Sequence, residues 1–404
     1  MQYLHCAEDN FFSDNRFFMR RTSIDVLHPV WAAIDCSAIR HNFHLIRSHV
    51  EKSVKIMAVI KADAYGHGAT PVARLLAREG ADAFGVARLC EAQQLRKDGI
   101  LQPILIFGYT PPGNASILAA DDIIQTVHSL EYAKALHCAA QAAGCRIRIH
   151  IKIDTGMGRL GFLAKGNGGK VLLAEVLQLL ASCNTLLIEG IFTHFASSDA
   201  AVLDNAHRQL KLFKATLDDS GLISLPDGLC VHAANSAATM VMPEAHFDMV
   251  RPGIVLYGLH PSTEMKTSAF DLRPAMSIKA RIASVKHVPK GFSVSYGHSY
   301  VTTKETVIAA IPIGYADGYP RLLSSRGSML VHGIRANVIG RVCMDQVMLD
   351  VGHIPDVHES DEVVILGQQG ENEITADELG QATDTINYEV VSRILARVPR
   401  EYVE

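Results

Sequence analysis

Short apolar segments recur along the first two thirds of the chain, and most of them are separated by longer amphipathic stretches. Eight such segments occur, at 56–60, 83–87, 104–107, 123–127, 147–153, 186–192, 229–233 and 248–252. The amphipathic stretches include 69–78, 130–143, 171–182 and 203–220. A segment that is apolar on both faces needs cover on both sides, as parallel strands with crossover helices provide. The pattern therefore predicts an α/β fold, and eight repeating units favour a (β/α)8 TIM barrel over an open doubly wound sheet.

The pattern changes after about residue 260. Residues 261–274 hold Pro, Ser and Thr and indicate a linker. Beyond them lie β-rich runs with tight turns, at 276–288, 306–313, 329–331, 338–342, 347–351 and 363–366. We therefore expect a flexible N-terminal extension over 1–28, a barrel over 29–262 and a mainly antiparallel C-terminal β domain over 263–404. Residues 29–36 are also β-like and could pair with the β domain.

Composition narrows the class of protein. The chain has 404 residues, of which 48% are hydrophobic, and a formal net charge of −4. This balance argues against a nucleic-acid or anionic-membrane partner. None of the eight cysteines forms a C-x-x-C pair, so we expect scattered buried thiols in a reducing compartment. The first twenty-odd residues lack a signal-peptide pattern, and no apolar stretch is long enough to span a bilayer, so we expect a cytoplasmic protein.

The first chemical signal is a lysine at the end of the first barrel segment. Residues 58–68 read AVIKADAYGHG, with Lys61 directly after the apolar run. Barrel enzymes place their chemistry at the carboxyl ends of the strands. A lysine held there beside apolar residues can have the lowered pKa that a nucleophilic amine needs. A lone lysine after a strand is ordinarily a surface residue. Only the complete string at 58–68 favours a nucleophilic lysine over a surface one.

Four further strings follow later barrel segments. They are KIDTGMGRLG at 152–161, FTHFASSD at 192–199, HAANSAA at 232–238 and VRPGIVLYG at 250–258. Arg159 offers a rigid fork for a carboxylate or phenolate, and Ser236 with the surrounding small residues suits a phosphate. Taken singly, each string has an ordinary explanation, such as a surface ion pair, a hydrogen-bonded histidine or a helix N-cap.

Three strings in the second domain complete the set, and the whole set resembles a known family. They are VSYG at 294–297, IGYADG at 313–318 and GRVCMDQ at 340–346. In this order, from about residue 29 to residue 400, the strings closely resemble those of alanine racemases, which are barrel-type pyridoxal-phosphate enzymes. The resemblance implies interconversion of L- and D-alanine, with Lys61 carrying pyridoxal 5'-phosphate and acting as one base. It also implies a homodimer with shared active sites, in which Tyr296 of the partner subunit is the second base.

The resemblance assigns roles to individual residues. Cofactor binding is implied for Lys61, Tyr65, His194, Asn235, Ser236, Arg251, Gly253 and Ile254. Substrate binding is implied for Arg159 and Met344, and supporting roles for Lys152, His232, Tyr315 and Asp345. Asp199, Arg321, Arg341 and Ile394 are implied to line the access channel. The lysine that matches Lys152 is often carbamylated in the family, and no metal is implied.

One position departs from the family, and several alternatives stay open. Many relatives carry a tyrosine where this chain has Ala396, so the pocket could be wider and serine a secondary substrate. A barrel-type decarboxylase is disfavoured, because an arginine such as Arg251 facing the pyridine nitrogen weakens the electron sink. The alternative outside the enzymes is a protein that binds pyridoxal phosphate without catalysing a reaction. Cys343 has no evident histidine partner and is interpreted as structural. Whether the enzyme serves cell-wall synthesis or alanine breakdown is left open.

Overall fold

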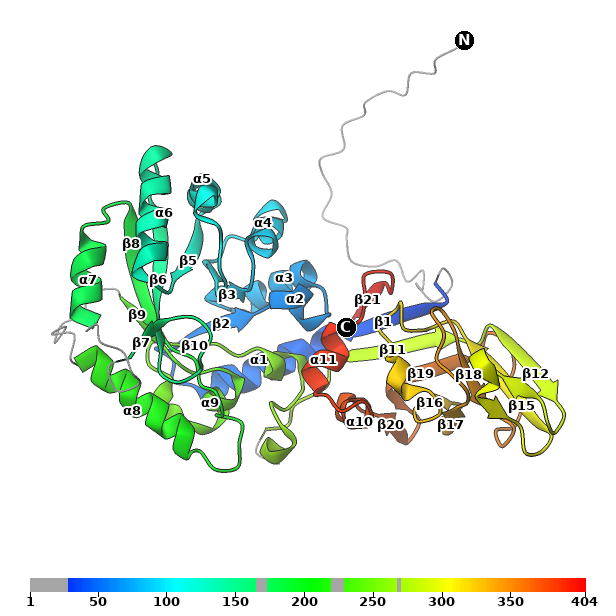
Figure 1. Cartoon of the computed structure of the whole chain (residues 1–404). Coiled ribbons are helices and arrows are strands. Elements are labelled where there is room, and N and C mark those ends of the chain that lie inside the picture. Colours follow the sequence, from blue (N-terminus) through cyan, green and yellow to red (C-terminus); the bar gives the residue numbers. More distant parts are fainter. Residues whose placement is uncertain (1–27, 165–172, 219–228, 267–269) are drawn as a thin grey trace, which may run out of the picture.

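The computed structural model describes residues 28–164, 173–218, 229–266 and 270–404. The expected flexible extension therefore lies outside the described residues, apart from residue 28. Figure 1 shows two bodies side by side: strands surrounded by helices, and a long twisted sheet. Long strands β1 (Val30–Asp35) and β11 (Met276–Arg281) run from the sheet toward the barrel.

The first body is a nearly closed parallel barrel, which confirms the predicted fold class. Its strands, in spatial order, are β10 (Met249–Val250), β2 (Lys55–Val59), β3 (Ala83–Val86), β4 (Ile104–Ile106), β5 (Ile123–Val127), β6 (Ile147–Asp154), β8 (Leu186–Phe192) and β9 (Cys230–His232). The two-residue β7 (Phe162–Leu163) pairs with the end of β6. Between β9 and β10, the amide of Asp248 donates to the carbonyl of Val231, which brings the barrel close to closure.

Helices cover the outside of the barrel. They are α1 (Cys36–His49), α3 (Ala69–Glu79), α4 (Leu89–Lys97), α5 (Ala115–Ala120), α6 (Leu130–Ala142), α7 (Leu173–Ala181), α8 (Asp204–Asp218) and α9 (Ser236–Val241). The segment α2 (Lys61–Tyr65) is a left-handed turn that follows β2. Short 3-10 turns are η2 (Pro112–Asn114), η4 (Pro243–Ala245), η5 (Ile254–Tyr257) and η6 (Thr263–Met265). Local capping explains several helix starts: the side chains of Asp35 and Ser129 accept from backbone amides in the first turns of α1 and α6.

The second body is a mainly antiparallel sheet, as predicted. Its order is β12 (Ser284–Val288), β15 (Thr306–Ile311), β18 (Val347–Asp350), β17 (Ile334–Val338), β16 (Ser328–Val331), β19 (Glu362–Gln369), β11, β1 and β21 (Arg400–Val403), with β20 (Asn372–Ile374) beside β19. Strands β13 (Ser293–Val294) and β14 (Tyr300–Val301) form a separate hairpin around η7 (Tyr296–His298). The remaining elements are η8 (Arg321–Leu323), α10 (Ala376–Ala382) and α11 (Asn387–Ser392).

Strand β1 belongs to this sheet although it precedes the barrel in sequence. It pairs antiparallel with β11 and parallel with β21, so both ends of the described chain join the C-terminal sheet. The carboxyl end of β1 leads directly into α1 of the barrel. Pairing with the terminal strand β21 thus ties the C-terminus to the junction between the two bodies (Figure 1).

Several local predictions were wrong in detail. The run 276–288 is two strands, because the backbone breaks at Ile282–Ala283. The strand expected at 338–342 is β17, which lies earlier, at Ile334–Val338. The thiols are not uniformly buried: Cys90 and Cys138 are exposed, and all seven cysteines of the described chain are free. Within the described ranges, no helix is long and apolar enough to cross a bilayer.

Candidate active site

Lys61 lies at the carboxyl end of β2, where it begins an unusual left-handed turn. Ala62, Asp63, Ala64 and Tyr65 have φ values of 53–54°. Each non-glycine residue in this conformation costs about 1–2 kcal/mol, so the turn needs support from its surroundings. Gly66 continues the turn with φ 86°, and a Cβ there would collide with the carbonyl oxygen of Val391 in α11. The turn is therefore shaped by packing against the C-terminal domain.

Hydrogen bonds hold this turn from the barrel side and from the C-terminal side. In the barrel, Glu91 Oε1 accepts from the amide of Ala62 at 2.6 Å, and its Oε2 accepts from the amide of Ala87 at 2.7 Å. From the C-terminal strand, Arg400 Nε donates to the carbonyl of Gly66 at 3.0 Å, and the Tyr402 hydroxyl donates to the carbonyl of His67 at 3.1 Å. These contacts offset the cost of the left-handed backbone and orient Lys61.

We expect Glu91→Ala to destabilise the protein by about 2 kcal/mol, because it leaves backbone amides without their charged acceptor. It should also weaken cofactor binding, since the amide next to Lys61 loses its anchor. Urea unfolding and a cofactor titration measure the two effects. Glu131→Ala is the matched control, since Glu131 is also a first-turn glutamate but is exposed on α6. Unchanged stability and affinity in Glu91→Ala would show that the anchor is unimportant.

Four basic side chains act on one histidine at the carboxyl end of the barrel. Burial, with Arg251, Arg159, Lys152 and Lys61 in decreasing order, lowers the pKa of His194 well below its usual value. Burial and Arg159 also lower the pKa of Lys61. Burial, Arg159 and Arg251 lower the pKa of Lys152 to about 8. The basic side chains create a strongly positive electrostatic potential around the neutral imidazole of His194. Such a site suits anionic groups of a ligand.

The carboxylates near this field already have hydrogen-bond donors. Asp154 Oδ1, at the end of β6, accepts from the amides of Gly156, Met157 and Gly158 at 2.8–3.2 Å. Glu91 is held by the amides described above, and Arg88 N also donates to it. Both carboxylates therefore bind backbone amides of loops and not the basic side chains of the site. Much of the positive charge around His194 is thus available to a ligand.

A buried chain of polar groups extends from Arg251 across the barrel. Arg251 Nη1 donates to His232 Nδ1 at 2.8 Å, and His232 Nε2 lies 2.8 Å from His150 Nδ1. Because guanidinium only donates, His232 must carry its proton on Nε2 and pass a hydrogen bond to His150. Burial lowers the pKa of His150 to about 3 and that of Arg251 to about 9. The chain fixes the guanidinium, which also donates to the carbonyls of Thr193 and Ala233.

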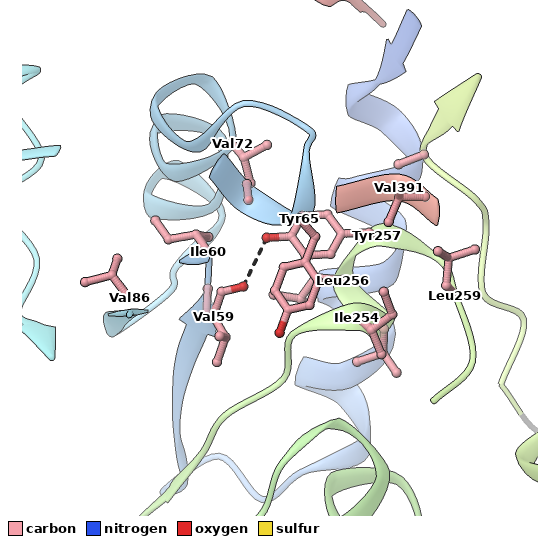
Figure 2. Close-up of a cluster of buried hydrophobic side chains, with 14 of the residues drawn as sticks. Val59, Ile60, Tyr65, Val72, Val86, Ile254, Leu256, Tyr257, Leu259 and Val391 are labelled. Atoms are coloured by element: carbon pink, nitrogen blue, oxygen red, sulfur yellow. Dashed lines mark hydrogen bonds between the residues drawn. The ribbon is translucent and has the colours of Figure 1, made fainter. Parts of the chain in front are cut away.

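A second group of predicted residues meets where β9 and β10 end. Ser236 Oγ accepts from the amide of Gly253 at 2.8 Å. A Cβ at Gly253 would lie 2.7 Å from the Tyr65 hydroxyl, so only glycine leaves this space open. Asn235 caps α9 and accepts from Ser198 Oγ at 2.9 Å. Figure 2 shows the buried side chains packed near Tyr65, among them Ile254. Small residues, hydroxyls and backbone amides form a cradle suited to a phosphate.

The predicted residues of the C-terminal domain form a different surface. Tyr296 is 69% exposed and Met344 is 52% exposed. Together with Cys343 and Asp345 they line a pocket of about 590 Å³ whose described lining residues all belong to this domain. Within one chain, the structure therefore does not bring Tyr296 to Lys61.

The remaining predicted residues are spread over the two domains. Tyr315 is exposed, and its amide donates to the carbonyl of Cys343; Arg341 lies beside Gly297. Asp345 forms an ion pair with Arg397 at 2.6 Å. Asp199 accepts a hydrogen bond from Ser262 through its carbonyl, and Ile394 is buried while its carbonyl accepts from Arg400. Arg321 is exposed at the start of η8.

Some residues of the site were not identified from the sequence. His150 lies in β6 at alternate positions with Lys152 and Asp154, and all three are buried. This period-two run of polar residues in an apolar strand could have identified His150. Glu91 could be suspected as a first-turn glutamate, whereas its bond to Ala62 has no sequence signal. Tyr388 lies in a string that fits the family but was assigned no role of its own; its ring centroid lies 6.1 Å from that of Tyr65.

Comparisons with known proteins agree over almost the whole chain. Residues 34–261 match the family model described as alanine racemase, N-terminal domain, and residues 275–402 match alanine racemase, C-terminal domain. The chain is 47% identical over 376 residues to an alanine racemase of Desulfosudis oleivorans, covering 92% of this chain and 96% of the relative. It is 48% identical over 375 residues to one of Desulforamulus reducens, covering 93% and 99%.

Solved structures give the same result. The alanine racemase of Clostridium difficile 630 superposes with a TM-score of 0.86 at 39% identity, covering 93% of this chain and 96% of that chain. The alanine racemase of Bacillus anthracis with bound L-Ala-P superposes with a TM-score of 0.87 at 36% identity, covering 93% and 95%. The similarity includes both domains.

Proposed function

This chain belongs to the alanine racemase family, and we propose on that basis that it interconverts L- and D-alanine, with Lys61 carrying pyridoxal phosphate. The observation that supports this best is the cluster of Lys61, Arg159 and Arg251 around the neutral His194, with Arg251 Nη2 lying 3.4 Å from His194 Nδ1. Such a field matches the phosphate and phenolate oxygens of the cofactor and the carboxylate of an amino acid.

The residues present fit the cofactor. The cradle of Ser236, Gly253 and Tyr65 suits its phosphate, and the buried Lys61, with its lowered pKa, suits covalent attachment. Arg251 offers only donors, so it would hydrogen-bond an unprotonated ring nitrogen. When bound, the cofactor supplies the electron sink that makes the α-proton of alanine labile.

The chain's own residues then position the substrate and move its α-proton. We assign Lys61 Nζ to one face of the substrate Cα and the Tyr296 hydroxyl of a second subunit to the other. Arg159 and the amide of Met344 would hold the substrate carboxylate. Neutral His194, held near Arg251, would orient the Tyr296 hydroxyl. Racemisation follows because one group removes the α-proton and the other returns a proton to the opposite face.

A homodimer with shared sites is part of this proposal. Tyr296 and Met344 line one pocket, and the backbone of the exposed Tyr315 bonds to Cys343 of the same pocket. Phe292 and Val301, at the two ends of the hairpin that carries Tyr296, are also exposed. Exposed apolar side chains gathered in this way are typical of a protein interface. A twofold dimer would place each such surface against the barrel of the other subunit.

The proposed activity is tested by incubating the holoenzyme with a panel of amino acids in deuterated water. We expect rapid α-proton exchange and loss of optical purity with either alanine enantiomer. Bound cofactor without exchange would overturn the proposal in favour of a non-catalytic protein, and release of carbon dioxide would indicate a decarboxylase.

Ala396 supports a finer proposal, that serine is a secondary substrate. Ala396 is exposed on the loop that Arg397 anchors to Asp317 at 2.8 Å. Replacing it by tyrosine restores the bulkier family residue, so Ala396→Tyr should lower the ratio of serine to alanine kcat/KM by about tenfold. Leu395→Tyr, one residue away, is the control and should leave this ratio near the wild-type value. An unchanged ratio in Ala396→Tyr would rule out this role.

We also propose that Lys152 is carbamylated. The neutral amine would attack carbon dioxide, forming an N–C bond and releasing one proton. Since the pKa of Lys152 is about 8, the neutral fraction and the carbamate should increase as pH rises through that value. Carbon-13 NMR with labelled bicarbonate measures this, and the signal should vanish in Lys152→Ala but persist in Lys55→Ala. A signal that persists in Lys152→Ala would refute the assignment.

A further inference from the structure

Residues 394–400, here called the terminal segment, form a compact turn between α11 and β21. Figure 1 shows these two elements between the barrel and the sheet. Within the segment, the amide of Val398 donates to the carbonyl of Leu395 at 3.1 Å, and Val398 is fully buried. The carbonyl of Pro399 accepts from the amide of Ala32 in β1 at 2.9 Å. The terminal segment is therefore fixed at the junction of the two domains.

Arg400 joins the terminal segment to the lysine turn. Its Nε donates to the carbonyl of Gly66 at 3.0 Å. Its two Nη atoms donate, at 2.6–2.8 Å, to the carbonyls of Ile394, Leu395 and Val398. The guanidinium is planar, so these donors keep a fixed geometry relative to one another. One rigid group thus holds both the lysine turn and the terminal segment.

Arg397 joins the same segment to the surface that carries Met344. Its Nε lies 2.8 Å from Asp317 Oδ1, and its Nη2 lies 2.6 Å from Asp345 Oδ1. The Asp317 side chain is only 3% exposed, and its Oδ2 accepts from the amide of Gly314 at 2.8 Å. Loss of Arg397 would leave this buried carboxylate without its cation, which is costly. Asp345 directly follows Met344 in the chain.

The loop that carries Asp317 also packs closely on Met344. The amide of Ala316 donates to the Met344 carbonyl at 3.0 Å. A Cβ at Gly314 would lie 2.3 Å from the same carbonyl oxygen, so the two backbones touch. On the other side of this loop, the Asp317 carbonyl accepts from the amide of Leu395 in the terminal segment at 3.1 Å. Displacement of the terminal segment would therefore displace the Met344 backbone.

We propose that Arg397 is a positioning residue that serves both active sites of the dimer. This inference rests on the proposed function, in which Lys61 belongs to the chain's own site and Met344 completes the site of the other subunit. Arg397 acts on Met344 through its two carboxylate partners, and on the lysine turn through the terminal segment and Arg400. These contacts are contiguous, which is what coupling between two sites requires physically.

Hydrogen–deuterium exchange of the holoenzyme tests the link within one chain. In Arg397→Gln, the amides of residues 62–68 should exchange about fivefold faster, the lower end of coupling between sites, although the ion pairs of Arg397 lie on Asp317 and Asp345. Arg393→Gln is the matched control, because Arg393 is also exposed but pairs with Glu389, four residues earlier. Unchanged exchange at the lysine turn in Arg397→Gln would refute the link.

Dimers with a single intact site test whether one arginine serves two sites. A heterodimer of a Lys61→Ala chain and a Tyr296→Phe chain has one complete site, with the lysine from the second chain and the tyrosine from the first. Arg397→Gln in the tyrosine-supplying chain should raise KM for alanine about fivefold with little change in kcat, because it releases the Met344 backbone. In the lysine-supplying chain it should lower cofactor affinity about fivefold, read from visible absorbance, and leave KM unchanged.

This split between the two placements separates positioning from a general loss of stability. A purely structural role would give the same effect in either chain, so equal effects, or no effect in either, would overturn the proposal. Arg393→Gln in either chain should match the parent heterodimer. Exchange is measured without substrate, so its failure would leave the proposed racemase function untouched, whereas an inactive parent heterodimer would refute the shared site itself.

Discussion

Lys61→Ala is expected to abolish racemisation, lowering kcat by more than about 10⁴-fold, since the change removes both the cofactor attachment and one proton-transfer group. The visible absorbance of the covalently bound cofactor should disappear as well. The fold should survive, because the strand β2 before Lys61 and the anchors at Glu91 and Arg400 remain. Absorbance spectra, circular dichroism and a coupled alanine assay measure the three effects.

Lys55→Ala is the matched control for this variant. Lys55 begins the same strand, but it is exposed at the amino end of the barrel, far from the field around His194. We expect wild-type spectra and rates from it. Retained covalent cofactor in Lys61→Ala would show that another amine carries the group, and the assignment of the site would then be wrong.

Tyr296→Phe is expected to lower kcat by about 10²–10⁴-fold, the contribution of a positioned acid or base. The absorbance of the bound cofactor should be unchanged, since the tyrosine takes no part in its attachment. Tyr300→Phe is the control, because Tyr300 begins strand β14 of the hairpin whose η7 turn carries Tyr296. Wild-type racemisation by Tyr296→Phe would exclude this hydroxyl as a base.

Mixing the two inactive variants tests whether the site is shared between subunits. In a Lys61→Ala/Tyr296→Phe heterodimer, one site combines the intact lysine of one chain with the intact tyrosine of the other. Random exchange of equal amounts should therefore restore about one quarter of the wild-type activity. If Tyr296 acted within its own chain, no heterodimer site would be intact and the mixture would stay inactive.

The barrel strands were predictable because their signal is local. All eight apolar segments correspond to strands, from β2 at Lys55–Val59 to β10 at Met249–Val250. Strand and helix predictions were wrong where the same local pattern fits more than one structure. The continuous β-like run at 276–288 bends at Ile282–Ala283, and the 14-residue α1 was missed between two apolar segments.

The resemblance to the family's strings implied roles for Lys61, Arg159, His194, Ser236 and Arg251, because the order of the strings along the chain is readable from the sequence. The left-handed backbone at Ala62–Tyr65 was not predictable, because no residue in it favours positive φ strongly enough to indicate it. The turn exists because distant groups hold it: Glu91 lies 29 residues away from Ala62, and Arg400 lies 334 residues from Gly66.

The amino-acid sequence alone therefore determined the barrel, the β domain and the order of the chemical groups, because periodic burial and short motifs are properties of neighbouring residues. Only the tertiary structure decided how these groups act together. Three properties depend on contacts between residues far apart in the chain. They are the positive charge around His194, the hydrogen-bond directions along Arg251, His232 and His150, and the exposure of Tyr296. Burial and charge proximity, which set these properties, exist only after the chain has folded.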